Sequence, residues 1–175
     1  GGGLAGAGSA AGTPSRTTGK FGFAQDFDDS SSPQNHIRLD AVSDATWTAV
    51  TVQAWINPDD TGDDRIFGKS WGTGSSDQTW LLRKNTANIG SRMRTNTTNN
   101  GGFDPFAYSS GSWYQAAVTW DASDNQLRVY VNGVQRGNTT LNALVDCALC
   151  MWVLILLLAR RMIRHVILEE ADYSF

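Results

Sequence analysis

The chain has little of the side-chain chemistry on which most enzymes depend. Among its 175 residues, glutamate is absent from residues 1–168 and histidine occurs only as His36 and His165. Neither histidine has a recognisable nucleophile motif beside it, so both are predicted to be structural. The sequence therefore gives no indication of nucleophilic catalysis assisted by a histidine base.

Cysteine is equally scarce, and the spacing of the two cysteines does not by itself indicate a zinc site or a redox site. Cys147 and Cys150 form a single C-x-x-C motif. A zinc site would need a second pair or histidines at ligand spacing, and a thioredoxin-like site would need a βαβ pattern. The sequence offers neither, so the motif is interpreted as accidental.

The chain also lacks an excess of positive charge and a long apolar run. Its 14 Lys and Arg against 17 Asp and Glu give a net charge of -3, so neither nucleic acid nor an anionic membrane is an electrostatically favoured partner. The longest apolar run, residues 148–159, is shorter than the ~20 residues that a membrane-spanning helix requires. Extending it past Arg160 and Arg161 would add charges that cost about 2.5–3.5 kcal/mol each near the bilayer centre. No membrane span is predicted.

Short strands joined by polar turns are what the sequence does contain. In residues 114–120 the side chains alternate with the period of two that a strand requires. Residues 121–125 then turn the chain, and residues 126–131 alternate again. Asn132 and Gly133 follow as the pair most able to adopt the positive backbone angles of a two-residue hairpin turn. Residues 134–136 return as a third strand, so this stretch is predicted to form three short antiparallel strands.

The same pattern extends over most of the chain. Further strands are predicted at residues 21–27, 36–39, 50–57, 65–70, 79–84 and 89–95. Pro58 ends one of them by removing a backbone donor. Trp55, Trp113 and Trp120 lie within predicted strands and are expected in the core. About eight to ten strands at this spacing predict an all-β, two-sheet antiparallel sandwich rather than a parallel sheet.

Two motifs within these strands carry a family resemblance. The pattern W-x-x-x-A-V-T-W-D begins at Trp113, and L-x-V-Y-V-N-G begins at Leu127. Three upstream stretches fit as well: residues 19–28, 36–39 and 50–58. Over roughly residues 19–144 the chain resembles the laminin-G-like, or concanavalin A-like, jelly-roll superfamily of lectins and glucanases. The resemblance implies a jelly-roll sandwich and leaves the activity open, because this fold hosts many unrelated functions.

Residues 1–18 have the composition of a flexible linker, rich in glycine, alanine, serine and threonine. They lack the basic start and long apolar centre of a secretion signal, so no targeting peptide is predicted. A chain that begins inside a linker is expected to be part of something longer. By resemblance, its location is secreted or at the cell surface.

Residues 145–175 differ from the rest in composition, since they contain both cysteines, both glutamates and no glycine. Related domains continue here with strands that complete the sandwich. The jelly roll is therefore predicted to be incomplete at its C-terminal strands, with an open edge that invites aggregation or recruits an aberrant, helical tail. Two origins of this tail stay open: a native segment, or a frame shift, because codons 151–153 read one base earlier must encode Val-Gly. Sequencing the DNA across codons 140 to 175 decides between them.

The resemblance also implies a test for catalysis. A hydrolase resembling the laminarinases would carry Glu-x-Asp-x-x-Glu on one strand, because retaining cleavage needs two carboxyl groups about 5–5.5 Å apart. Residues 1–168 contain no glutamate. The pairs Asp59/Asp60 and Asp63/Asp64 do not substitute, since neighbours on an extended strand point to opposite faces and these pairs lie in a loop. The domain is predicted not to be an enzyme.

Calcium is the one cofactor that the resemblance implies, because jelly rolls of this kind commonly hold Ca²⁺ in rim loops. Ca²⁺ takes six to eight oxygen ligands. The predicted metal set consists of Asp59, Asp60, Asp63 and Asp64, with Asp26, Asp28 and Asp29 as a second supply. The alternative for either cluster is a solvated acidic turn.

Sugar binding needs aromatic rings that stack on sugar faces, together with polar groups that meet hydroxyls. The predicted ligand-binding residues are Trp71, Trp80, Phe103, Phe106 and Tyr108, with Trp71 first among them. The alternative for each ring is simple packing.

Two functions follow, with hydrolysis as a third and weakest. The first is a non-catalytic carbohydrate-binding or recognition module of a larger secreted or cell-surface protein, with a polysaccharide or glycoprotein and other domains of the parent chain as partners. The second is a structural or adhesive spacer domain that binds protein. Glycan binding that depends on Trp71 would favour the module, and tandem copies in the parent gene would favour the spacer.

Overall fold

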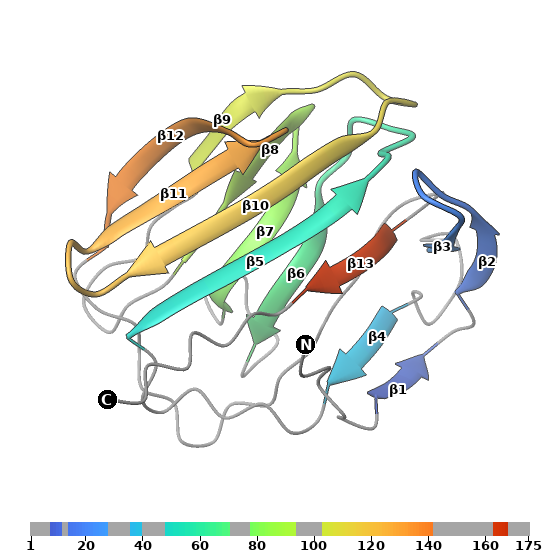
Figure 1. Cartoon of the computed structure of the whole chain (residues 1–175), viewed down its shortest axis with the longest axis horizontal. Coiled ribbons are helices and arrows are strands. Elements are labelled where there is room, and N and C mark those ends of the chain that lie inside the picture. The colour runs from blue at the N-terminus through green and yellow to red at the C-terminus, as the bar shows by residue number, and fades with distance from the viewer. Residues whose placement is uncertain are drawn as a thin grey trace.

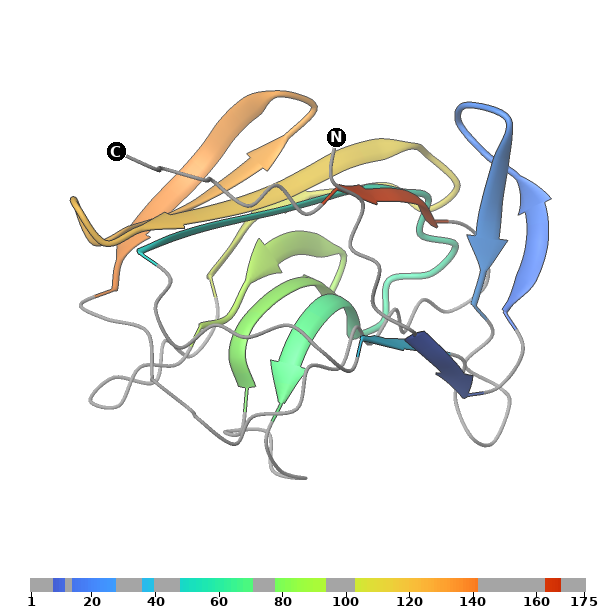
Figure 2. The same ribbon diagram turned by 60° about the horizontal axis from the view of Figure 1, so that its bottom comes forward.

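The computed structural model describes residues 8–11, 14–27, 36–39, 48–70, 78–93, 103–141 and 163–167. Within these residues the chain forms strands and turns and no helix. Two antiparallel sheets lie face to face, and a short pair of strands lies at one end (Figure 1; Figure 2). The predicted all-β, two-sheet antiparallel sandwich is confirmed.

The sheets differ in size. The seven-stranded sheet has the order β12-β11-β10-β5-β13-β3-β2. Its strands are β2 (Ser15–Thr18), β3 (Phe23–Asp26), β5 (Ala49–Ile56), β10 (Tyr114–Asp121), β11 (Gln126–Val131), β12 (Val134–Thr140) and β13 (Ile163–Ile167). The four-stranded sheet consists of β6 (Asp64–Ser70), β7 (Gln78–Asn85), β8 (Asn88–Ser91) and β9 (Phe103–Ala107). The separate pair is β1 (Gly8–Ala11) with β4 (His36–Leu39).

The core lies between the two large sheets and follows the predicted alternation. Val52, Val118 and Val129 stand opposite one another on β5, β10 and β11, and each is 3% exposed or less. They face Ile66, Leu82 and Ile89 of the smaller sheet within one hydrophobic cluster. Full burial of such a side chain contributes about 1.5–3 kcal/mol. Because the inward positions are apolar, the alternate positions carry the polar side chains outward.

Both turns of the β10–β11–β12 meander were predicted and are confirmed. Asn132 and Gly133 have positive φ angles of 54° and 75°, the geometry of the favoured two-residue hairpin turn. In the preceding turn, the carboxylate of Asp121 accepts a hydrogen bond from the backbone N–H of Ser123 at 2.7 Å. These turns fix the register of the three strands and hence which side chains face outward.

The strand β9 was not predicted. The segment Phe103–Ala107 forms β9, although Pro105 lies in its middle. Proline cannot donate to a ladder, so it is tolerated in a strand at a sheet edge. β9 is an edge strand of the four-stranded sheet, which explains why proline does not interrupt it.

Part of the predicted N-terminal linker is also ordered as strand. Ser15–Thr18 forms β2, which pairs with β3 along its whole length. The guanidinium of Arg16 lies over the ring of Phe23, 3.7 Å from its centroid. Threonine favours strands, and this cation–π contact adds to the pairing. The linker interpretation of residues 15–18 is therefore corrected.

Of residues 145–175, the structure describes the strand β13, which lies between β5 and β3 (Figure 1). Ile163 pairs with Ile56 of β5 and with Gln25 of β3, and the register with β5 shifts further along the strand. The prediction of a helical tail otherwise falls outside the described residues, as do both cysteines and His165's side chain. In the part of the chain that the structure describes, no helix has the length and apolar character needed to cross a bilayer.

Candidate functional site

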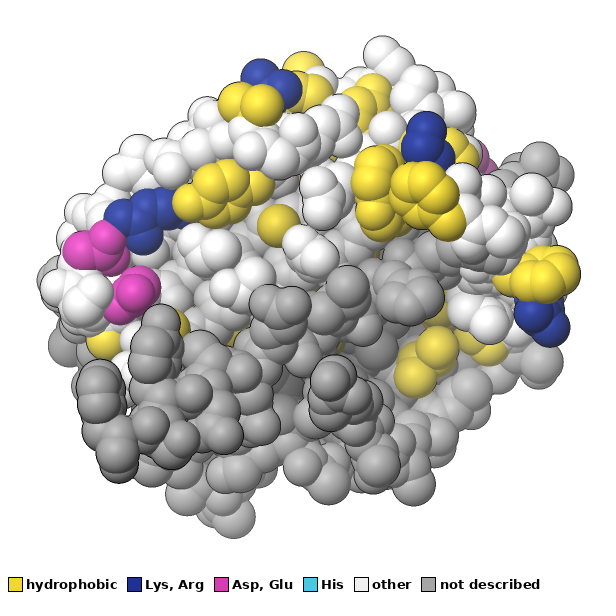
Figure 3. Space-filling view, in the orientation of Figure 1, with side chains coloured by type: hydrophobic (Ala, Val, Ile, Leu, Met, Phe, Trp, Pro, Cys, Tyr) yellow, Lys and Arg dark blue, Asp and Glu magenta, His cyan; other side chains and the backbone are white. Residues whose placement is uncertain are grey.

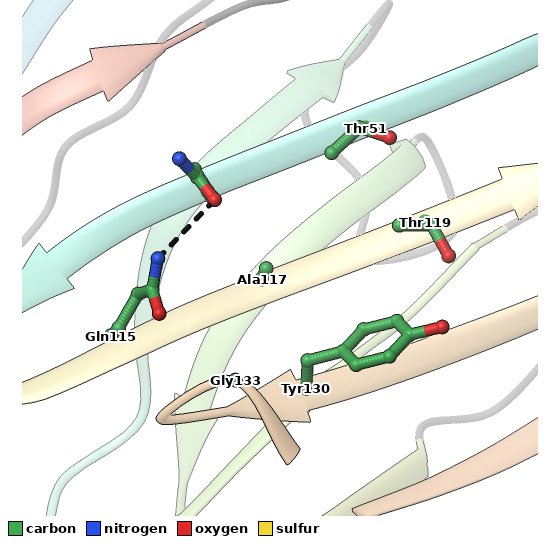
Figure 4. Close-up of a pocket in the computed structure, with 7 residues that line it drawn as sticks. Thr51, Gln115, Ala117, Thr119, Tyr130 and Gly133 are labelled. Atoms are coloured by element: carbon green, nitrogen blue, oxygen red, sulfur yellow. Dashed lines mark hydrogen bonds between the residues drawn. The ribbon is translucent and has the colours of Figure 1, made fainter. Parts of the chain in front are cut away.

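The outward surface of β5, β10 and β11 is hollowed into an open depression of about 250 Å³. We call this surface the sheet face. The depression is lined by Thr51, Gln53, Gln115, Ala117, Thr119, Tyr130 and Gly133 (Figure 4). Every one of these residues comes from an outward position of a strand or from the β11–β12 turn, so the depression is held by the rigid part of the sheet.

The polar side chains that line the depression make few hydrogen bonds with other described residues. The hydroxyls of Thr51, Thr119 and Tyr130 make no hydrogen bond with any described residue. The amide of Gln115 donates to the side-chain oxygen of Gln53 across 3.5 Å (Figure 4), which is a long and weak hydrogen bond. A row of hydroxyl and amide groups therefore remains open to a ligand that itself carries many hydroxyls.

Trp55 continues the sheet face beyond the depression. It follows Gln53 at the next outward position of β5 and stands opposite Gln115 of β10. Its side chain is partly exposed, whereas Ala54 and Ile56 on either side are buried. The expectation that Trp55 lies in the core is wrong, and the alternation of β5 already indicated this, because it groups Trp55 with threonine and glutamine.

A hairpin tip covers one edge of the Trp55 ring. In the β2–β3 turn, the N–H of Gly19 donates to the carbonyl of Gly22 at 2.9 Å, and Gly22 has a φ of 69°. The ring of Phe21, which is 63% exposed, meets Trp55 edge-on at 5.4 Å between centroids. The ammonium of Lys20 lies 5.9 Å from the centroid of the Trp55 ring. We call Lys20, Phe21 and Trp55 the aromatic corner.

The opposite end of the sheet face is occupied by its own interactions. Arg128 forms an ion pair with Asp124, and the side-chain amide of Gln126 donates to the hydroxyl of Thr140 at 3.1 Å. Figure 3 shows basic and acidic side chains next to each other at this end, and hydrophobic with basic side chains at the other. The aromatic corner and the depression are therefore the part of the sheet face whose side chains are better placed to contact a ligand.

Of the five predicted aromatic residues, the structure describes the side chains of Phe103, Phe106 and Tyr108. Trp71 lies outside the described residues, and Trp80 is placed in β7 by its backbone alone. Phe103 and Phe106 of β9 are partly buried and pack against the core. Tyr108 is 7% exposed, and its hydroxyl donates to the backbone carbonyl of Asp60 at 2.8 Å, so its ring offers no open face for stacking.

The predicted metal residues surround a lysine. The ammonium of Lys84, whose side chain is fully buried, contacts carboxylate oxygens of Asp60 and Asp64, the latter at 2.5 Å. Asp63 instead accepts a hydrogen bond from the backbone N–H of Thr86 at 2.9 Å. Asp59 is partly buried in the same loop.

This arrangement already contains a cation. Burial lowers the pKa of Lys84, but the hydrogen bonds to Asp60 and Asp64 raise it by more, so the pKa lies above that of an ordinary lysine. Within the described residues, no three His, Cys, Asp or Glu side chains are arranged to hold a metal. With Lys84 in place, two of the four predicted carboxylates do not fit Ca²⁺, which needs six to eight oxygens. Of the second acidic set, Asp28 and Asp29 lie outside the described residues.

Comparison with known proteins places the chain in a family. A family profile of the concanavalin A-like lectin/glucanases superfamily matches residues 29–148, which is more than half of the chain. The chain belongs to this superfamily. A search of curated proteins found no match.

Solved structures share the jelly-roll fold of this concanavalin A-like domain at low sequence identity. Domain 4 of AbnA, an extracellular GH43 arabinanase from Geobacillus stearothermophilus, in complex with arabinotriose, is 18% identical with a TM-score of 0.56, and the match covers 91% of this chain and 78% of that one. The CBM40 of a Ruminococcus gnavus sialidase bound to α2,3-sialyllactose is 14% identical with a TM-score of 0.53, covering 70% and 74%.

A third structure is larger than this domain. The binding domain of Paraclostridial Mosquitocidal Protein 1 is 13% identical with a TM-score of 0.64, and the match covers 89% of this chain and 40% of that one. The concanavalin A-like domain thus spans less than half of that toxin domain. These likenesses establish the fold.

Proposed function

We propose that this concanavalin A-like domain is a non-catalytic carbohydrate-binding module of a larger secreted or cell-surface protein, and that it binds a polysaccharide or glycoprotein glycan on the sheet face. The observation that supports this most directly is the row of uncommitted hydroxyl and amide groups in the depression beside Trp55. Sugars need directional partners for their hydroxyls and a flat apolar surface for their ring faces. The sheet face offers both on adjacent strand positions.

The names of the similar structures agree with this proposal. The arabinanase domain is described with arabinotriose and the sialidase module with sialyllactose. One is a domain of an arabinanase and the other a domain of a sialidase, each with a bound sugar, and this chain shares their fold. A module of this kind would bring a parent protein to its glycan.

The sheet face is suited to binding rather than cleavage. No carboxylate is among the residues that line the depression. Asp121, at the end of β10, and Asp124, in the turn that follows, accept backbone hydrogen bonds within that turn. Glycoside cleavage by the usual route needs two carboxyl groups that flank the scissile bond, and the lining residues supply neither.

A protein-binding spacer is the second candidate, and one observation favours it. Phe21 and Phe23 are 63% and 59% exposed on the β2–β3 hairpin. Exposed aromatic rings of this kind are frequent in protein interfaces. Loss of binding to a protein partner on Phe23→Ser, with glycan binding intact, would assign this hairpin to the spacer function.

The glycan proposal is tested by affinity electrophoresis of the full chain through gels that contain neutral and acidic polysaccharides. Trp55→Ala should weaken binding roughly threefold to tenfold because it removes a stacking surface. Gln115→Ala should weaken it by a similar factor because it removes one hydrogen-bonding amide. The melting temperature of each variant shows whether the fold is intact.

Trp71→Ala is the matched comparison, since it alters a tryptophan of the loop predicted from the sequence. If Trp71→Ala abolishes binding while Trp55→Ala and Gln115→Ala keep it, the ligand binds the loop and not the sheet face. Absence of retardation on plant, algal and bacterial polysaccharides alike would overturn the module itself.

A further inference from the structure

The aromatic corner contains a positive charge that forms no ion pair within the part of the chain that the structure describes. Among the described residues, Lys20 contacts the Trp55 ring and makes no ion pair. Three other cations differ from Lys20: Arg83 pairs with Asp104 at 2.5 Å, Lys84 with Asp60 and Asp64, and Arg128 with Asp124. The charge of Lys20 is thus available to a ligand.

The position of Lys20 is set by the backbone. It lies in the turn between β2 and β3, which the Gly19–Gly22 hydrogen bond closes. Phe21 anchors this turn on Trp55. The ammonium is therefore held beside Trp55, which occupies the outward position next to Gln53 on β5 and stands opposite Gln115.

A second cation lies on the same hairpin. Arg16 is exposed and lies over the ring of Phe23, again without an ion pair among the described residues. Figure 3 shows hydrophobic and basic side chains next to each other at this end of the molecule. The residues that line the depression carry no acid that would repel an anion. Two cations, Lys20 and Arg16, therefore lie on this hairpin although the whole chain has a net charge of -3.

The contact that Lys20 makes now is easily exchanged. An exposed cation–π contact is weaker than a charge-assisted hydrogen bond to an anionic oxygen. A sugar that carries an anionic group above Trp55 would draw the ammonium away from the ring, and the freed ring face would remain for stacking.

We propose that the sheet face prefers a glycan with anionic sugar units, and that Lys20 is the residue that determines this preference. The proposal rests on the proposed function, because it names the substrate class of the same site. The group recognised is an anionic oxygen of a carboxylate or a sulfate, since an ammonium is a point charge without the planar fork that selects one of them.

The test compares pairs of polysaccharides that share a backbone, one member of each pair being charged and the other neutral. The probes are polygalacturonate against its methyl ester for the carboxylate, and dextran sulfate against dextran for the sulfate. The wild-type full chain should bind at least one charged form about threefold to tenfold more tightly than its neutral counterpart, as expected of a single partly exposed ion pair. Raising the salt concentration should reduce this ratio.

Lys20→Met keeps most of the aliphatic stem and removes the charge, so it should bring the ratio close to one while binding to the neutral form persists. Lys20→Arg should keep the ratio. Arg136→Met is the matched control, because Arg136 also lies over an aromatic ring, that of Phe106 at 4.7 Å, but extends from β12. It should leave the ratio unchanged.

Equal binding of charged and neutral forms, or a ratio that Lys20→Met does not change, overturns the anionic preference and leaves the proposed function intact. A failure of all four probes and of other neutral polysaccharides to bind overturns both. A preference for the carboxylate pair alone or the sulfate pair alone supports the proposal and identifies the anion.

Discussion

At the scale of single residues, the buried Lys84 is the side chain with the clearest structural role. Its ammonium is the cation between Asp60 and Asp64, and Asp60 in turn holds Tyr108 through its carbonyl. The acidic loop that the sequence suggests as a metal site thus contains its own positive charge. The local sequence around Lys84 does not predict these ion pairs, because Asp60 and Asp64 lie about twenty residues earlier in the chain.

Lys84→Met should destabilise the domain by about 2–3 kcal/mol. Removing one partner of a buried ion pair costs roughly 3–5 kcal/mol, and the value here falls lower because the side chain of Asp60 is 47% exposed. Urea unfolding followed by tryptophan fluorescence measures the difference. Arg128→Met, which removes the cation of the exposed Asp124 pair, is the control and should leave the midpoint unchanged.

Calcium should not raise the melting temperature of the wild-type chain at millimolar concentration, because Lys84 competes for the same carboxylates. A ligand at 100 times its dissociation constant would add about 2.7 kcal/mol. A clear upward shift in a calcium titration, absent with magnesium, would instead support the predicted metal site.

Stability should fall as the pH rises above about 10. Burial raises the pKa of Tyr108 to about 12, against about 10 in an unfolded chain. Because the folded state keeps this proton to higher pH, its contribution is complete below pH 10 and is lost between about pH 10 and 12. The raised pKa of Lys84 acts in the same direction.

The urea midpoint measured from pH 8 to pH 11.5 checks this. Tyr108→Phe removes the titrating hydroxyl and should show a smaller fall than the wild type. Tyr130→Phe removes a hydroxyl that has no hydrogen bond among the described residues and should show the full fall. An equal fall in all three proteins would contradict the assignment to Tyr108.

At the scale of elements, β12 depends on a glycine for its close approach to β9. A Cβ added at Gly137 would overlap the ring of Phe103 and lie 3.1 Å from Pro105. This contact closes the sandwich on the side of β12, where the two sheets meet. Gly90 has the same function between β8 and β9, where a Cβ would meet the backbone next to Asp104.

Gly137→Ala should therefore destabilise the domain by about 1–3 kcal/mol, the usual cost of overpacking a filled site. Gly62→Ala is the matched control, because its added Cβ would meet the flexible end of Asp60 at 3.4 Å and should change stability little. Thermal melting of both variants and of the wild type measures these differences in stability. Equal melting temperatures would show that β12 can move away from β9 without loss.

At the scale of elements, strands were predictable where the alternation of side chains and the residues of the adjoining turn indicated the same structure. β5, β10 and β11 and the Asn132–Gly133 turn followed from the alternation of their side chains. β9 did not, because its proline argues against a strand unless the strand is known to be at an edge. β2 did not either, because four residues of Ser, Arg and Thr acquire strand structure only by pairing with β3. Sheet order is a tertiary property, so a local pattern does not contain it.

At the scale of the whole molecule, the sequence predicted the sandwich but did not indicate the sheet face. The core pattern repeats over many residues, so single errors such as Trp55 do not change the fold. The binding surface depends on which outward side chains of β5, β10 and β11 become neighbours, for example Trp55 with Gln115. That register comes from pairing partners 60 residues apart, which alternation within one strand does not reveal.

The strand β13 bears on the origin of residues 145–175, which are either a native segment or the product of a frame shift. It lies between β5 and β3 but pairs with β5 through Ile163, Arg164 and Ile167, with a register shift. A closing strand in full register would pair along more of the eight residues of β5. Among the described residues, β13 therefore pairs with only part of the edge of β5, and an edge that is paired in part can accept another chain.

Three chains test this: residues 1–144, the full chain, and a chain in which residues 145–175 are replaced by the translation of the shifted frame. Deleting the tail should expose the edge of β5 and cause concentration-dependent association in size-exclusion chromatography. Restoring the frame should give the highest melting temperature of the three, because a Gly-containing strand can pair in register with β5. If residues 1–144 stay monomeric and melt at the temperature of the full chain, β13 contributes nothing and the sandwich is complete without it.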